Sequence, residues 1–158
     1  MRHALAHTAA LLRKTSPGSY SDANLYHLTL AFLGEYPHAG MDQLVSALQA
    51  AVKNTSPFQL TLGDIGTFGP VLWRGVQAQP ALDALAHGVR HSLDSAGIYY
   101  DPKPFRPHIT LARDVQLSPD AHSIKLPGSS CTVRSVILYE STRASGHLAY
   151  VPRAEIQI

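Results

Sequence analysis

A five-residue pattern, histidine-aliphatic-threonine-leucine-alanine, occurs twice in the 158-residue chain, at residues 27–31 and 108–112. Both copies alternate polar and apolar side chains at their start, as half-buried strands do, because successive side chains of a strand point to opposite faces. In each copy the histidine and the threonine should therefore share one face, whereas the aliphatic residue and the leucine face the core. The copies lie about half the chain apart, so the fold has to supply two similar strands.

The two motifs place chemically active side chains together. If the halves of the chain are related by a pseudo-two-fold, His27 and Thr29 would face His108 and Thr110 across a cleft. One imidazole can then deprotonate an incoming oxygen and the other can protonate a leaving oxygen, while the hydroxyls hold the nonbridging oxygens of a phosphate.

Other interpretations of the motifs are less favoured. A single His-x-Thr is more often a pair of residues that pack or cap at the start of a strand, but duplication of the whole pattern favours a functional site. A metal site needs more ligands, and neither motif is accompanied by a His-x-x-x-His or by a pair of carboxylates.

The remaining pattern predicts an α+β fold with mostly antiparallel sheet, in a single domain over residues 1–158. Helices are expected where apolar residues recur at helical spacing, and strands where they alternate or form short runs. The expected helices cover residues 3–14, 41–52 and 82–93, and the expected strands cover 25–33, 58–62, 71–76, 108–113, 132–139 and 147–156.

Composition narrows the class of protein further. The hydrophobic fraction of 45% and the charged fraction of 15% are typical of a globular chain, and the net charge of +2 permits an anionic ligand. Cys131 is the only cysteine, which argues against a disulfide framework or a cysteine-based zinc site, and we expect it to be a small buried residue. No apolar stretch is long enough to span a membrane and no secretory signal is evident, so a cytoplasmic location is expected.

Four segments carry a family resemblance: residues 24–35, 66–69, 72–73 and 105–113. With them the chain resembles the 2H phosphoesterase superfamily, and most closely its bacterial and archaeal RNA 2′,3′-cyclic phosphodiesterases, long called 2′-5′ RNA ligases. The resemblance implies a bilobal α+β fold, with an antiparallel sheet flanked by helices in each lobe and a central cleft. It also implies that no metal or organic cofactor takes part.

The same resemblance implies a reaction and a role for each motif residue. RNA 2′,3′-cyclic phosphate ends would be hydrolysed to 2′-phosphates, with His27 as the general acid and His108 as the base that activates water. Thr29 and Thr110 would bind the phosphate, and Arg113 would neutralise its charge. A regular strand puts Arg113 on the face opposite His108, so its role requires a bulge or the end of the strand.

The partners expected from this function are RNA ends or oligonucleotides that carry a cyclic phosphate. Arg74, Lys103 and Arg106 are candidates for steering the RNA backbone. Candidates for stacking on a terminal base are Tyr26, Phe32, Phe68, Trp73, Tyr99, Tyr100 and Phe105, although each is more often a core residue.

Two alternatives stay open at this point. The same site could act on 2′,5′-linked oligonucleotides, on small cyclic nucleotides or on ADP-ribose phosphates, as a phosphodiesterase or a ligase. The chain could also be a non-catalytic RNA-binding protein, although binding alone would not require two titratable imidazoles.

The N-terminus departs from the family pattern. Relatives usually open with a short apolar strand before the first helix, whereas residues 1–5 here run directly into helix. Three outcomes are open: the sheet is one strand smaller, a segment from elsewhere in the chain or from a neighbouring molecule fills the gap, or the sequence begins downstream of the natural start. We favour a sheet that is smaller or is completed by a partner, in a monomer or a homodimer.

Overall fold

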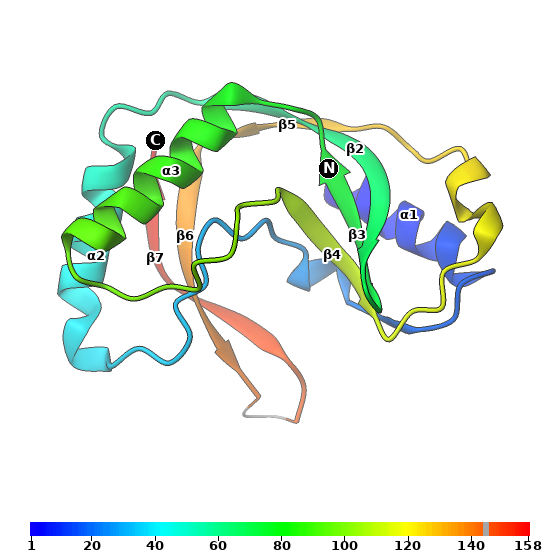
Figure 1. Cartoon of the computed structure of the whole chain (residues 1–158), viewed down its shortest axis with the longest axis horizontal. Helices are drawn as coiled ribbons and strands as arrows, with labels where there is room; N and C mark the ends of the chain where they lie inside the picture. The colour runs from blue at the N-terminus through cyan, green and yellow to red at the C-terminus, as the bar shows by residue number, and fades with distance from the viewer. Residues whose placement is uncertain (144–145) are drawn as a thin grey trace. The chain divides into compact units, whose positions relative to one another are not determined.

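The computed structural model describes residues 1–143 and 146–158 and has the α+β architecture that the sequence predicts (Figure 1). Strands β1, β4, β3, β2 and β5 form one sheet in that order, and β6 and β7 form a second sheet. The pairs β1–β4, β3–β4, β2–β3 and β6–β7 are antiparallel. The helices are α1 (Arg2–Arg13), α2 (Met41–Val52) and α3 (Pro80–Ser95), and the strands are β1 (Ser19–Tyr20), β2 (Phe58–Phe68), β3 (Val71–Val76), β4 (His108–Arg113), β5 (Ser130–Val133), β6 (Ser135–Thr142) and β7 (Ala149–Gln157).

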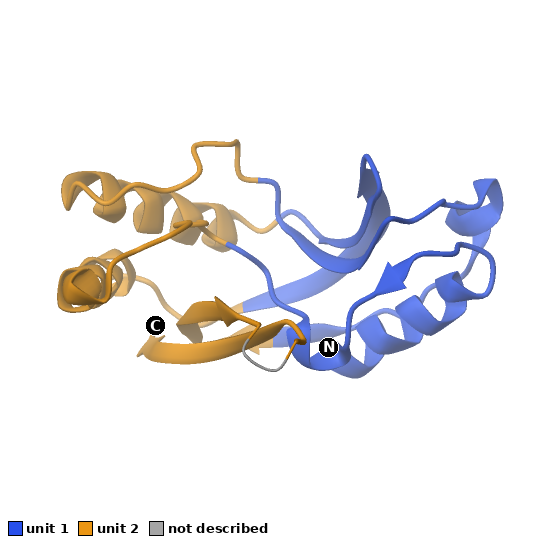
Figure 2. Ribbon diagram, turned by 90° about the horizontal axis from the view of Figure 1, so that it is seen from below, with its two compact units in different colours: residues 1–29, 59–78, 106–131 blue, residues 30–58, 79–105, 132–158 orange. Residues whose placement is uncertain are grey.

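The chain divides into two compact units, each assembled from three separate segments (Figure 2). Unit 1 comprises residues 1–29, 59–78 and 106–131, and unit 2 comprises residues 30–58, 79–105 and 132–158. Both sequence motifs begin in unit 1, so the histidines and threonines belong to the same unit rather than to one unit each. The interpretation of residues 1–158 as a single domain stays a prediction.

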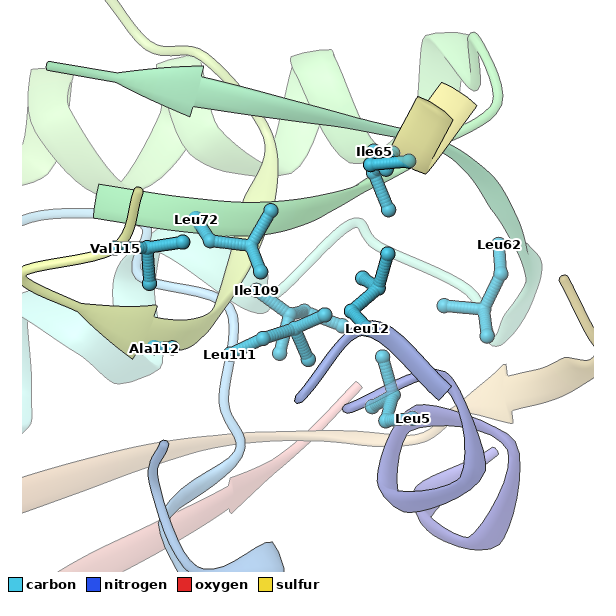
Figure 3. Packing of buried hydrophobic residues seen from close by; sticks show 10 residues of the cluster. Leu5, Leu12, Leu62, Ile65, Leu72, Ile109, Leu111, Ala112 and Val115 are labelled. Carbon is cyan, nitrogen blue, oxygen red and sulfur yellow. The ribbon is translucent and has the colours of Figure 1, made fainter. Parts of the chain in front are cut away.

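The core of unit 1 lies between helix α1 and one face of the larger sheet. Leu5 and Leu12 of α1 pack with Ile109 and Leu111 of β4 and with Leu72 of β3 (Figure 3). All five side chains are at most 4% exposed, and burial of each contributes roughly 1.5–3 kcal/mol. Because α1 covers this face, the side chains that alternate with Ile109 and Leu111 point away from the core.

Unit 2 has its own core, in which α2 and α3 pack against each other and the β6–β7 hairpin joins the same cluster. Helix α3 begins with Pro80 in its first turn, and the side chain of Gln79 accepts a hydrogen bond from the backbone N–H of Ala81. Gly97 follows the helix with φ +66°, a left-handed conformation that favours glycine and ends the helix.

The predicted boundaries of α2, β3 and β4 are confirmed, but the strand expected at residues 25–33 is wrong. A short 3-10 helix (Ala23–Leu25) precedes the first motif, and within residues 25–33 only Leu28 forms a β-bridge, to Ile109. Alternation in sequence is retained without a continuous ladder, because alternation sets which side chains are buried but does not supply a neighbouring strand. The run predicted at 132–139 is split between β5 and β6, and the two-residue β1 was not predicted.

Helix α1 begins at Arg2, so residues 2–5 are helical, as the sequence predicts. Cys131 is only half-buried, at the start of the short strand β5, so its expected burial is wrong. Among the described helices, none is long and apolar enough to cross a membrane.

Candidate active site

The two motifs lie side by side because Leu28 and Ile109 form an antiparallel bridge. In antiparallel geometry the residues on either side of such a pair are also neighbours, so His27 lies alongside Thr110 and Thr29 alongside His108. Ile109 is buried and Leu28 packs against the core of unit 1, which leaves both histidines and both threonines on the opposite, half-exposed face. An antiparallel bridge has a local two-fold axis, and this axis relates the His-Thr pair of one motif to that of the other.

Both imidazoles are held in the same way. The Nδ1 of His27 lies 2.7 Å from the backbone oxygen of Leu25, and the Nδ1 of His108 lies 2.6 Å from the backbone oxygen of Arg106. A carbonyl oxygen can only accept, so each Nδ1 carries the proton and donates it. The Nε2 atom of each ring is therefore the one that is left to take up or give a proton in a reaction.

A bulge in β4 decides the orientation of Arg113. Trp73 pairs with Thr110 but the adjacent Leu72 pairs with Ala112, so β4 contains one extra residue between these pairs. Leu111 and Ala112 are both fully buried, and Arg113 is exposed. The bulge thus returns Arg113 to the face of Thr110, which meets the geometric condition for its predicted role.

The aromatic rings of Phe68 and Trp73 lie beside His108. The ring of Phe68 meets the imidazole edge-on at a centroid distance of 5.0 Å, and the indole of Trp73 lies 6.3 Å away. Phe68 and Trp73 also contact each other at 5.1 Å, and the guanidinium of Arg106 lies 5.9 Å above the Phe68 ring. Of the predicted stacking residues, Phe68 and Trp73 are therefore the two that adjoin the second motif.

Two glycines, Gly66 and Gly75, make room for the ring of Trp73, and neither was predicted as a site residue. A Cβ atom at Gly66 would lie 2.3 Å from the indole of Trp73, and one at Gly75 would lie 3.3 Å from it. Gly75 is also the cross-strand neighbour of His108. Glycine inside a strand often marks a close approach, and this was the available signal.

The other candidates lie in different environments. Arg74 is buried on the opposite face of β3 from Trp73, so its predicted role in steering RNA is wrong. Lys103 forms an ion pair with Asp101 at 2.8 Å. Phe32 and Tyr99 are strongly exposed, Tyr26 packs against the core of unit 1, and Tyr100 and Phe105 pack with Arg90.

In the described part of the chain, the motif residues belong to no group of metal ligands, and they do not line the pocket found in unit 1. Within residues 1–143 and 146–158, no three histidine, cysteine or acidic side chains are grouped so that they could hold a metal ion. A pocket in unit 1 is lined by Asp64, Ile65, Arg74, His122, Ile124 and Leu126, and none of these is a predicted catalytic or phosphate-binding residue.

Comparison with known proteins identifies the family. The family model of the 2′-5′ RNA ligase superfamily matches residues 3–144. The chain belongs to the 2′-5′ RNA ligase superfamily. The structure is also similar to a crystal structure of Escherichia coli LigT complexed with 3′-AMP, with a TM-score of 0.82, 30% identity, and coverage of 99% of this chain and 90% of that one.

Two relatives within the superfamily are named RNA 2′,3′-cyclic phosphodiesterase. The Escherichia coli protein is 34% identical over 157 residues, which cover 96% of this chain and 86% of that protein. The Geobacillus stearothermophilus protein is 36% identical over 126 residues, 73% of this chain, and the match spans only 40% of that longer protein. These matches confirm that the chain is an enzyme of the family that the sequence motifs indicated.

Proposed function

We propose that this enzyme hydrolyses RNA 2′,3′-cyclic phosphate ends to 2′-phosphates, with His27 and His108 as its acid and base. The observation that carries the proposal is the shared arrangement of the two imidazoles. Both are on one face of adjoining motifs, and both are hydrogen-bonded at Nδ1 to a backbone oxygen. An acid-base pair of this kind can act at both ends of an in-line displacement.

The proposed reaction needs one proton acceptor and one proton donor. The Nε2 of His108 removes a proton from water as the water oxygen attacks phosphorus. The bond between phosphorus and the 3′ oxygen then breaks, and the protonated Nε2 of His27 gives its proton to that oxygen. The product carries a 2′-phosphate and a 3′-hydroxyl, and the two imidazoles return to their starting states by proton exchange with solvent.

Three further side chains would stabilise the charge that develops on the phosphate. Thr29 and Thr110 are on the face of the histidines and can donate hydroxyl hydrogens to nonbridging oxygens. Arg113 reaches the same face through the bulge in β4 and can supply two parallel N–H donors and a positive charge. Together these three side chains would stabilise the negative charge on the phosphate oxygens while the histidines transfer protons.

The similar proteins support the nucleotide part of the proposal. The relatives from two bacteria are named RNA 2′,3′-cyclic phosphodiesterase, and the similar LigT structure was solved with 3′-AMP. The test is to incubate the protein with an oligoribonucleotide that ends in a 2′,3′-cyclic phosphate, in excess EDTA, and to identify the product by ³¹P NMR. We expect a 2′-phosphate. Loss of activity in EDTA that zinc or manganese restores would refute the metal-free mechanism.

The separate roles of the two histidines can be tested with a modified substrate. Sulfur in place of the bridging 3′ oxygen makes a leaving group that does not need a general acid. We expect this substrate to restore much of the rate of His27→Ala but not that of His108→Ala. Rescue of His108→Ala instead would reverse the assignment of acid and base.

Ligation is a second candidate reaction of the same site, and the name of the family favours testing it. His108 would then deprotonate the 5′-hydroxyl of another RNA end instead of water, and the product would be a 2′-5′ linkage. Adding a 5′-hydroxyl oligonucleotide to the assay and separating products by length measures the partition between hydrolysis and ligation.

A further inference from the structure

Arg90, on helix α3 in unit 2, hydrogen-bonds two backbone oxygens from segments that are far apart in the sequence. Its Nε donates to the backbone oxygen of Leu30 at 3.2 Å, and its Nη1 donates to that of Lys103 at 2.8 Å. The guanidinium also lies 5.5 Å from the ring centroid of Tyr100 and 5.8 Å from that of Phe105. A planar guanidinium suits this arrangement, because its donors point in fixed directions and its faces can pack on aromatic rings.

The two segments that Arg90 joins are those attached to the two motifs. Leu30 directly follows Thr29, and Phe105 directly precedes the Arg106-Pro107-His108 sequence. The same two segments are linked a second time, because the N–H of Asp101 donates to the backbone oxygen of Phe32 at 2.8 Å. Each contact lies within unit 2, and the chain continues from both segments directly into the motif residues of unit 1.

The first motif lies in no continuous strand within the described part of the chain. In residues 26–33 the only β-bridge is the one formed by Leu28, whereas the second motif lies in strand β4 between β1 and β3. A continuous ladder would fix the position of His27 and Thr29 through many backbone hydrogen bonds. Where the ladder is absent, the hydrogen bond from Arg90 to the backbone oxygen of Leu30 can restrain the position of the adjacent Thr29.

We propose that Arg90 is a positioning residue for the two-histidine site: by binding the backbone oxygens of Leu30 and Lys103, in the segments attached to the two histidines, it fixes His27 and His108 relative to each other. It has no contact with the reacting atoms in this proposal, which rests on the proposed function. A displacement of about 1 Å in a catalytic group can cost about 100-fold in rate, so loss of this double contact should lower kcat.

The experiment compares Arg90→Ala and Arg90→Lys with a matched control, Gln43→Ala. Gln43 also donates from a helix of unit 2 to a backbone oxygen, that of Ala96 at 2.8 Å, but Ala96 caps the end of α3 and is farther along the chain from His108 than Lys103 is. kcat and KM are measured on the cyclic phosphate oligonucleotide at a temperature where circular dichroism shows each variant folded. The imidazole Cε1–H signals of His27 and His108 are recorded by NMR in parallel, assigned with the histidine variants.

For Arg90→Ala we expect kcat to fall about 10- to 100-fold with KM changed by less than about 3-fold, and both imidazole signals to shift. Arg90→Lys keeps the charge but cannot donate to both oxygens with one planar group, so its kcat should be intermediate. Gln43→Ala should lose some thermal stability but keep its kcat and its imidazole signals.

The proposal is overturned if both Arg90 variants have the same kcat and the same imidazole signals as Gln43→Ala. Arg90 would then be only a stabilising residue of unit 2. If Arg90→Ala does not fold, Arg90→Lys decides by the same criteria. If the wild-type protein does not hydrolyse the cyclic phosphate, the proposed function fails, while the NMR signals still decide whether Arg90 positions the histidines.

Discussion

Replacement of Arg74 by methionine tests whether this buried charge belongs to the scaffold rather than to an RNA-binding surface. The side chain is 4% exposed and donates to the Oγ1 of Thr8 at 3.2 Å and to the backbone oxygen of Pro127 at 3.3 Å. Among the described residues its Nε has no hydrogen-bond partner. Burial lowers the pKa of the Arg74 guanidinium, and the charge of Asp64 acts in the opposite direction.

The expected change in stability follows from these contacts. Two long hydrogen bonds to neutral acceptors contribute about 2 kcal/mol together, whereas removing a poorly paired charge from the interior recovers several kcal/mol. Thr8 keeps its hydrogen bond to the backbone oxygen of Ala4 at 2.8 Å, and methionine refills the space with a flexible apolar chain. We therefore expect Arg74→Met to be neutral or to stabilise the protein by up to about 3 kcal/mol.

Urea and thermal unfolding measure this change, and about 1 kcal/mol should shift Tm by about 2–4 °C in a chain of this size. Arg2→Met, at an exposed position of α1, is the control and should change stability by less than about 0.5 kcal/mol. Cyclic phosphodiesterase activity should be retained in both variants. Destabilisation of Arg74→Met by more than about 2 kcal/mol would refute the reasoning, because the charge would then be net stabilising.

Three further predictions concern the site itself. Gly66→Val should displace the Trp73 indole, destabilise the protein by about 1–3 kcal/mol and lower kcat/KM. The control is Gly128→Ala, because a Cβ there meets nothing within 4 Å, and it should change neither stability nor kcat/KM. Thr29→Val and Thr110→Val should each lower kcat/KM by about 10- to 100-fold, as the loss of a hydrogen bond to a charged group does; no loss in either would remove the threonines from phosphate binding. The pH profile of kcat/KM should fall on both sides of an optimum, because one imidazole must be neutral and the other protonated, and a rate that only rises with pH would contradict a required acid.

Local alternation was enough to predict which side chains of the second motif share a face. His108 and Thr110 are opposite the buried Ile109, as expected. In the first motif, which lies in no strand, Leu28 packs against the core of unit 1 but Leu30 packs against the core of unit 2. The missing ladder could not be predicted, because pairing depends on which segment folds beside the motif rather than on the motif itself.

The identity of the motif residues could be predicted from the sequence, but the contacts that orient the residues around them could not. The orientation of Arg113 depends on one extra residue in β4, and register shifts of this kind leave no clear trace in a single sequence. Arg90 binds backbone oxygens, which every residue has, so its partners cannot be identified from residue types. Arg74 was misassigned for the opposite reason: a basic side chain in a strand was expected at the surface, whereas this one is buried and donates to Thr8 of α1.

The most direct test of the central claim is single-turnover hydrolysis of a 2′,3′-cyclic phosphate oligonucleotide by His27→Ala, His108→Ala and the control His122→Ala. His122 is an exposed histidine outside both motifs. We expect the first two variants to lose at least about 100-fold in rate while remaining folded, and the control to match the wild-type protein. A near-normal rate in either His27→Ala or His108→Ala would contradict the two-histidine mechanism.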